Sequence, residues 1–268
     1  MEGDMMVMES SALDICKYTY TGMKPPVDHI DVFTDGMESG GGGDEQDEEE
    51  EYEGSPCEKL KLQNANTNYK AKITALDKSS VFNKKKETGF SEDKNGNFTD
   101  LEPYTSTSTS DGLEVPITSS TKGYVHSHQN DYETGNIDAN GNIEIKKPIR
   151  MFSPGDVSFL MDMAQLQTDG NYEDLYGTMV SSYGNYTIKF TGTSADIKTG
   201  FDTEKWKDKY REYRDSNKEM SFEKLFLTFL RDQMQVEGVS LYKIKDNGTV
   251  QQKTLNANNT VNTVECPK

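Results

Sequence analysis

The chain has 268 residues, of which 46 are acidic and 29 are basic, and its formal net charge is −17. Hydrophobic residues make up 32% of it, a thin supply beside the ~45–50% of globular chains with Gly counted, so one ordinary domain and a polar remainder are expected. No basic run offsets the negative charge, which excludes a protein that tracks nucleic-acid phosphates. No stretch approaches the ~18 consecutive apolar residues of a membrane-spanning helix.

Residues 1–56 are expected to be a disordered linker. Gly40 to Gly43 precede an acidic run over residues 44–53, and both glycine and repelling like charges favour a solvated chain. The first four residues carry neither a basic nor an apolar targeting segment, so cytoplasm is the default expectation. Export or a place at the cell surface is expected instead if the chain is a piece of a longer protein.

A folded α/β domain is predicted over residues 57–266, with cysteines at its two ends. Cys57 and Cys266 bracket the domain, and Cys16 lies in the linker. The three cysteines lack the close C-x-x-C spacing of zinc knuckles and redox sites. A disulfide between Cys57 and Cys266 in an oxidising compartment and three unrelated reduced thiols both fit this pattern.

The first half of the domain is predicted to contain one helix, strands and hairpins. The helix is expected over 59–79, a polar turn around 94–97, and strands near 98–104 and 123–126. Asn140-Gly141 indicates a further hairpin, because this dipeptide suits a tight turn and isoleucines flank it.

The second half is predicted to be richer in helices. One helix opens at 153–156 and places Val157, Leu160, Met161 and Ala164 on one face. A hairpin follows around 183–185, and then a helix with aromatic residues on one face, Trp206, Tyr210 and Tyr213. The last helix is expected to have Ser221 as its N-cap and Gly238 as its C′ residue. A strand over 239–244, a turn at 247–248 and a polar tail complete the prediction.

Two histidines lie at the end of the predicted strand near 123–126. Residues i and i+2 of a strand point to the same face, so His126 and His128 can share one metal ion, for which zinc is the natural candidate. Asp156 is the leading candidate for a third ligand, because the first turn of a helix can direct its carboxylate back to the strand end. A water in the fourth position would become a nucleophile. Surface imidazoles and a plain helix cap, in which Ser153 pairs with Asp156, are the alternative interpretations.

Together these residues resemble the signature of the JAMM (MPN-type) zinc metalloproteases, a His-x-His strand end followed by Ser-x-x-Asp. The resemblance implies a cytidine-deaminase-like α/β fold with a mixed sheet packed against helices. It also implies that His126, His128 and Asp156 bind zinc and that Ser153 donates a hydrogen bond to the oxyanion. The family places a catalytic glutamate on an upstream strand; Glu87, within Glu87-Thr88-Gly89-Phe90, matches best, and Glu92 is the alternative.

The chain departs from the family pattern at two points. Gln129 stands where the family usually has proline, and Ser153 follows the histidines at a greater distance. The hairpin expected at Asn140-Gly141 accounts for the added length, since a hairpin leaves and returns at nearly the same point. Such an insertion would sit at the mouth of the site. The stretch 57–266 also looks like a Bacteroidetes-type group of bacterial proteins, a likeness that implies no activity.

The sequence therefore predicts a zinc-dependent hydrolase acting on peptide or isopeptide bonds of a peptide or protein substrate. The alternative is a non-catalytic MPN-type binding or structural module at the bacterial surface. A zinc nucleoside deaminase is excluded, because His-x-Glu and Cys-x-x-Cys are both missing.

Overall fold

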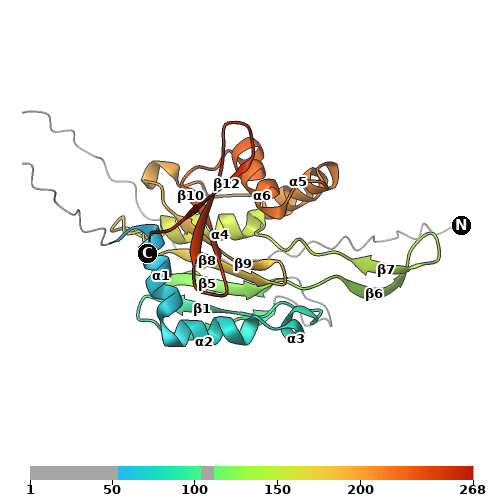
Figure 1. Ribbon diagram of the computed structural model, residues 1–268, viewed down its shortest axis with the longest axis horizontal. Coiled ribbons are helices and arrows are strands. Elements are labelled where there is room, and N and C mark those ends of the chain that lie inside the picture. Colours follow the sequence, from blue (N-terminus) through green and yellow to red (C-terminus); the bar gives the residue numbers. More distant parts are fainter. Residues whose placement is uncertain (1–53, 104–111, 268) are drawn as a thin grey trace, which may run out of the picture.

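The computed structural model describes residues 54–103 and 112–267, built around one large sheet (Figure 1). The sheet has eight strands in the order β12-β11-β10-β9-β8-β5-β1-β2. β5 and β8 are parallel and all other neighbours are antiparallel, so the predicted mixed sheet is confirmed. The strands are β1 Gly89–Asp93, β2 Phe98–Asp100, β5 Thr121–Ser127, β8 Tyr176–Ser181, β9 Gly184–Phe190, β10 Val239–Ile244, β11 Val250–Leu255 and β12 Val261–Glu265.

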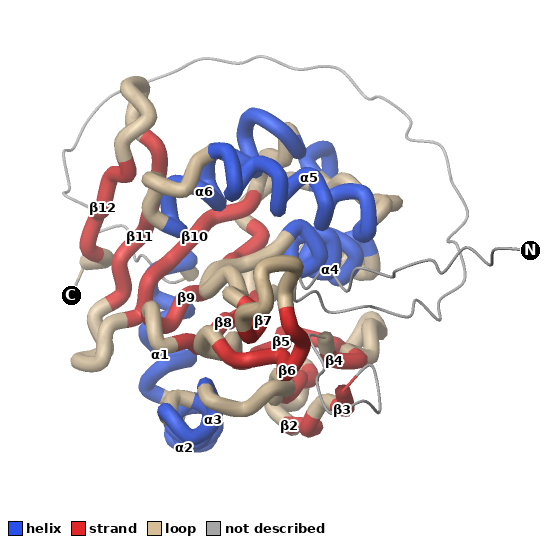
Figure 2. The backbone as a smooth tube through the Cα atoms, turned by 90° about the vertical axis from the view of Figure 1, so that its right-hand side faces the viewer, coloured by secondary structure: helices blue, strands red, loops and turns tan. Residues whose placement is uncertain are grey.

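Helices cover both faces of this sheet (Figures 1 and 2). One face carries α1 Pro56–Ala65, α2 Thr67–Leu76 and α3 Ser79–Phe82, and the other carries α4 Pro154–Gln165, α5 Thr203–Ser216 and α6 Phe222–Phe229. Side chains alternate between the two faces, as the pleat of a strand requires. Tyr124 of β5 joins the core beneath α4, whereas Val125 joins the core beneath α2. The two faces of the sheet therefore pack into two different hydrophobic cores.

The helix predicted over 59–79 is two helices, and the single-helix prediction is wrong. The break is at Asn66, whose ψ of 122° is extended and ends α1. Its side-chain oxygen then accepts hydrogen bonds from the backbone N–H groups of Asn68 and Tyr69, at 2.9 and 3.1 Å. Asn66 thus acts as the N-cap of α2, a role for which asparagine is well suited.

Two small hairpins lie outside the large sheet. One consists of β3 Glu102–Pro103 and β4 Leu113–Glu114, and the other of β6 Tyr132–Ile137 and β7 Ile143–Lys146. The second confirms the hairpin predicted from Asn140-Gly141, with Gly141 at a positive φ of 82°, and it projects away from the body (Figure 1). The strand predicted over 98–104 is divided between β2 and β3, and Tyr104 lies outside the described residues.

Two predicted N-caps are confirmed, whereas the predicted end of the last helix and the predicted C-terminal tail are not. Ser153 and Ser221 cap α4 and α6. Gly238 is not the C′ residue, because α6 continues as a π-helical turn, Leu230–Met234, which ends at Gln235 in the left-handed conformation. The turn predicted at 247–248 is present, but the prediction that a polar tail follows it is wrong. The chain instead adds β11 and β12 to the edge of the sheet.

A disulfide joins Cys57 and Cys266, which confirms the first of the two interpretations of the cysteines. It connects the start of α1 to the residue that follows β12, with the Cα atoms 5.5 Å apart. The linker is predicted over residues 1–56. Its residues 1–53, which include Cys16, lie outside the described residues. Within the described ranges, no helix has the length and apolarity needed to cross a membrane.

Candidate metal centre

The two histidines lie side by side at the end of β5. Their Nε2 atoms are 2.8 Å apart, and the residues His126 and His128 are 1% and 2% exposed. His128 follows the strand, but its backbone N–H donates to the carbonyl of Val180 at 2.9 Å, which extends the pairing with β8 past the end of β5. The backbone of both residues is therefore held by the sheet.

The tautomer of neutral His128 follows from its hydrogen bond to the main chain. Its Nδ1 lies 2.6 Å from the carbonyl oxygen of Ile149. A carbonyl can only accept, so Nδ1 carries the hydrogen and Nε2 presents its lone pair. This is the usual arrangement of a metal-binding histidine, in which a hydrogen bond at one ring nitrogen orients the other.

Glu87 approaches the histidines from the segment just before β1, the strand that pairs with β5. Its Oε1 atom lies 3.9 Å from Nε2 of His128, and the residue is 2% exposed. Gly89 is paired with His126 across the β1–β5 ladder, which brings the residues just before β1 alongside the strand end. A Cβ atom at Gly89 would lie 2.2 Å from the carbonyl oxygen of Val125, so glycine permits this close approach.

One donor atom from each of Glu87, His126 and His128 lies within 4.8 Å of the others. This buried group of two imidazoles and one carboxylate can hold a metal ion. Its chemistry does not specify which ion, because imidazole and carboxylate ligands suit zinc, iron and manganese.

Asp156 adjoins this group through one oxygen and caps α4 through the other. Its Oδ2 accepts hydrogen bonds from the backbone N–H and the hydroxyl of Ser153, at 2.7 and 2.8 Å. Its Oδ1 lies 3.5 Å from Nε2 of His126. The hydroxyl of Ser153 also accepts a hydrogen bond from the backbone N–H of Asp156, at 3.3 Å. The capping box expected as an alternative is therefore present, and it leaves Oδ1 directed to the histidines.

The second glutamate named from the sequence lies elsewhere. Glu92 comes two residues after Phe90, so both side chains lie on the face of β1 that packs against α2. Its carboxylate accepts hydrogen bonds from Tyr176 and Lys122, at 2.5 and 2.9 Å. It does not belong to the donor group around His126.

Other contacts at the centre were missed by the sequence reasoning. Tyr124 stacks on His126, with ring centroids 5.8 Å apart, and its hydroxyl donates to the backbone carbonyl of Asp156 at 3.0 Å. Its spacing of two residues from His126 is the signal that would have placed both on one face. The group that orients His128 is the backbone carbonyl of Ile149. Every residue has such a carbonyl, so no sequence pattern identifies this one.

Little of the centre reaches solvent. Ser153 and Asp156 are 3% and 1% exposed. The segment between β7 and α4 adds buried residues, among them Ile149, Met151 and Phe152. Contact with a large substrate therefore requires that part of this cover moves.

A scan against protein-family models, a search of the curated proteins and a search of the solved structures each found no match. Inference about function therefore depends on the residues described above.

Proposed function

We propose that this protein is a zinc-dependent hydrolase that cleaves peptide or isopeptide amide bonds. The observation that carries the proposal is the position of Glu87, whose carboxylate lies beside two adjacent imidazoles although it comes from the segment just before β1. The resemblance of the His-x-His and Ser-x-x-Asp motifs to the JAMM signature supports the same reaction class.

In this proposal the zinc ligands are His126, His128 and Asp156. Two ligands of one tetrahedral zinc lie about 3.3–3.4 Å apart, because zinc binds nitrogen and oxygen at ~2.0–2.1 Å. The separation of 3.5 Å between His126 and Asp156 is close to this value, and the imidazole nitrogens, at 2.8 Å, need to part only slightly. Glu87 lies farther from the nearer histidine nitrogen, at 3.9 Å from His128, although it and not Asp156 belongs to the group whose donor atoms all lie within 4.8 Å of one another.

The greater distance suits Glu87 as the acid–base group. When bound, the metal ion would lower the pKa of a coordinated water and polarise the carbonyl of the substrate. Glu87 then accepts a proton from the attacking water and returns it to the nitrogen of the leaving amine. Its carboxylate acts in both steps without leaving its place beside His128.

Ser153 is proposed as the donor to the oxyanion of the tetrahedral intermediate. In the structure its hydroxyl donates to Asp156. The hydroxyl must therefore turn toward the substrate, and the cap of α4 keeps the backbone N–H bond to Asp156 while it does so. A peptide or protein substrate would pass the β6–β7 hairpin, which lies between the histidines and Ser153 in the chain.

The burial of the centre favours a second candidate function. A donor group whose members are at most 2% exposed is also the arrangement of a structural metal site. The protein would then be a non-catalytic MPN-type module at the bacterial surface, in which the metal ion ties β5 to α4. The two candidates differ in whether substitution of Glu87 affects any reaction.

Metal content is the first experiment. Protein dialysed against zinc and then against metal-free buffer is expected to retain stoichiometric zinc, and the variants His126→Ala, His128→Ala and Asp156→Asn are expected to lose it. Elemental analysis by mass spectrometry provides the measurement. Retention of zinc by all three variants contradicts the ligand assignment and both candidate functions.

Glu87→Gln is the experiment that separates the two functions. The amide keeps the shape of the side chain and removes the proton acceptor, so zinc should be retained while cleavage of fluorogenic peptide and isopeptide amides falls about a hundredfold or more. Glu212→Gln, an exposed position on α5, is the matched control. Equal cleavage by Glu87→Gln and the parent would exclude Glu87 as the base, and zinc-dependent stability without cleavage would favour the structural module.

A further inference from the structure

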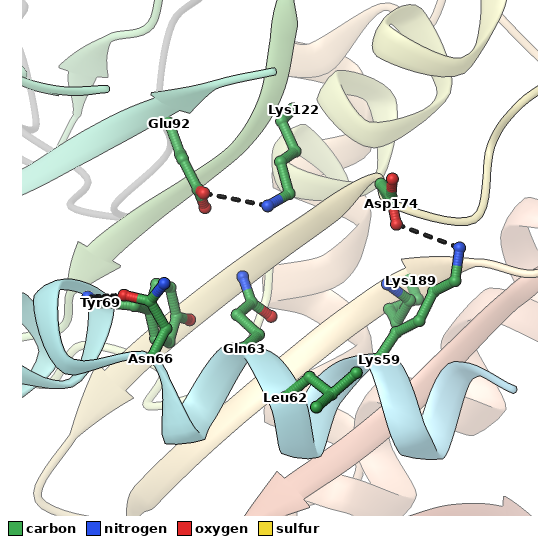
Figure 3. Close-up of a pocket in the computed structure, with 9 residues that line it drawn as sticks. All are labelled: Lys59, Leu62, Gln63, Asn66, Tyr69, Glu92, Lys122, Asp174 and Lys189. Carbon is green, nitrogen blue, oxygen red and sulfur yellow. Dashed lines mark hydrogen bonds and ion pairs between the residues drawn. The ribbon is translucent and has the colours of Figure 1, made fainter. Parts of the chain in front are cut away.

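A second site lies on the opposite face of the sheet, between α1 and the strands. It is a cavity of about 360 Å³ (Figure 3). The side chains of Gln63, Glu92 and Lys122 point into the same space from α1, β1 and β5 (Figure 3). The residues that line it are Lys59, Leu62, Gln63, Asn66, Tyr69, Glu92, Lys122, Asp174 and Lys189.

Two of the three lysines in this cavity are neutralised by carboxylates. Lys122 donates to Glu92 at 2.9 Å. Lys59 donates to Glu173 and Asp174, at 2.6 and 3.1 Å, in the loop before β8. Lys59 and Lys122 therefore both have carboxylate partners, and the third lysine of the lining differs from them.

Lys189 is that third lysine, and it is buried. It lies on β9 between Ile188 and Phe190, both of which pack into the core of the opposite face, so its side chain extends toward α1. It is 2% exposed. Among the described residues, its ammonium group makes no hydrogen bond and has no carboxylate within 4.0 Å. An ammonium group without a partner is costly to bury, which argues that the partner is a ligand.

Burial lowers the pKa of Lys189 to about 8. Asp174 and Glu173 oppose this effect, and Lys59 and Lys122 add to it. The group is therefore still largely protonated at neutral pH, and it can act as a cation toward a ligand in the cavity.

We propose that this cavity binds a small molecule carrying a single carboxylate, with the ammonium group of Lys189 as its charge partner. Three lysines and two carboxylates line the cavity, and Glu173 lies beside it, so the charges balance overall. Lys189 is the lysine of this lining that has no carboxylate of the described residues within 4.0 Å, and a single carboxylate of a ligand would fill that place. Glu92 and Asp174 lie in the same lining and would repel a dianion such as phosphate. The side chain of Gln63 points into the same space, and its amide nitrogen offers a second donor.

The size of the cavity also suits a small ligand. Ligand cavities in proteins span ~300–1,000 Å³, and this one is at the lower end. The site does not depend on the metal centre, because the histidines face α4 while Lys189 faces α1. Failure of the proposed hydrolase would leave this proposal intact.

The test uses the complete, oxidised protein and four probes: acetate, lactate, benzoate and inorganic phosphate. Binding is followed by calorimetry at pH 7 in a buffer free of other carboxylates. At least one monocarboxylate should bind saturably and more tightly than phosphate. Lys189→Met keeps the volume of the side chain and removes its charge, so affinity for that probe should fall about tenfold or more.

Lys253→Met is the matched control, because Lys253 is also buried but already bonds to Thr263 and pairs with Glu223. Its affinity for the probe should equal that of the parent. Equal binding by Lys189→Met and the parent, tighter binding of phosphate, or no saturable binding of any carboxylate would each overturn the proposal.

A measurement on the unsubstituted protein covers the case in which Lys189→Met does not fold. The affinity for the carboxylate should decrease as the pH rises through about 8, because Lys189 loses its proton while the probe stays ionised. An affinity that is constant from pH 7 to well above this value contradicts the role of Lys189.

Discussion

At the scale of single residues, the candidate metal centre depends on a glycine, Gly89. Gly89 lets β1 approach β5 so closely that Glu87 reaches the histidines. An added Cβ would lie 2.2 Å from the backbone oxygen of Val125 and 2.8 Å from the side chain of Leu113. Backbone cannot move aside as a flexible side chain can, so the two strands must separate.

Gly89→Ala is therefore expected to destabilise the fold by about 1–3 kcal/mol, the usual cost of overpacking. It should also lower the rate of amide cleavage, because separation of the strands moves the proposed acid–base group Glu87 away from His128. Urea unfolding and the amide cleavage assay measure the two effects. Ser91→Ala, on the same strand, is the control and should leave the cleavage rate unchanged. Unaltered stability of Gly89→Ala would contradict the close approach of β1 and β5.

The residues of the centre were predictable from sequence to different degrees. His126 and His128 could be paired because a strand places i and i+2 on one face. Asp156 could be added because a capping residue has a fixed position in the first turn of a helix. The place of Glu87 depends on the register of β1 against β5, which no local pattern determines. Lys189 could not be identified at all, since a lysine in a strand usually indicates the solvent-facing side.

At the scale of elements, α4 links helix capping to the metal centre. Ser153 and Ser221 are both N-caps that accept a hydrogen bond from the third residue of their helix, yet only Ser153 also contacts a candidate ligand. The pair therefore separates the cost of a lost cap from the effect on Asp156.

Ser153→Ala and Ser221→Ala should each lower the free energy of unfolding by about 1 kcal/mol, the typical value of an N-cap. Only Ser153→Ala should alter catalysis, by ~10²–10³ in rate if its hydroxyl acts on the oxyanion. Chemical denaturation and the amide cleavage assay provide the measurements. An equal loss of rate in both variants would show that general destabilisation, and not the oxyanion, is responsible.

Element predictions succeeded where the chemistry is local. The turns at Asn140-Gly141 and 247–248 and the caps of α4 and α6 are determined by a few neighbouring residues. The break at Asn66 was missed because the polar composition of 59–79 gives no strong periodicity that would stop at one residue. The strands β11 and β12 were missed because their polar sequences form strands only when β10 offers an edge for pairing.

At the scale of the whole molecule, the disulfide closes the described domain. Cys57 and Cys266 are separated by 209 positions in the sequence. Near them, Leu60 of α1 packs against Tyr242 and Val250 in a small core of its own. The covalent link and this core together hold the first helix against the C-terminal strands.

Loss of the disulfide in Cys57→Ser/Cys266→Ser is expected to lower the free energy of unfolding by about 4–5 kcal/mol, because a long loop in the unfolded chain gains much entropy when it is opened. Urea unfolding of the oxidised parent and of this variant measures the difference. Cys16→Ser is the control and should unfold like the parent. Thiol titration of the unfolded, unreduced parent should find one reactive cysteine, and three would contradict the pairing.

The same link determines how the domain would respond to mechanical load. A pulling force applied through the chain before Cys57 and after Cys266 passes directly across the Sγ–Sγ bond. The eight strands and the helices between these residues then carry no tension, so neither the metal centre nor the lysine cavity would be extended. In a force-spectroscopy experiment the oxidised domain should lengthen very little, whereas the reduced domain should release the whole enclosed chain.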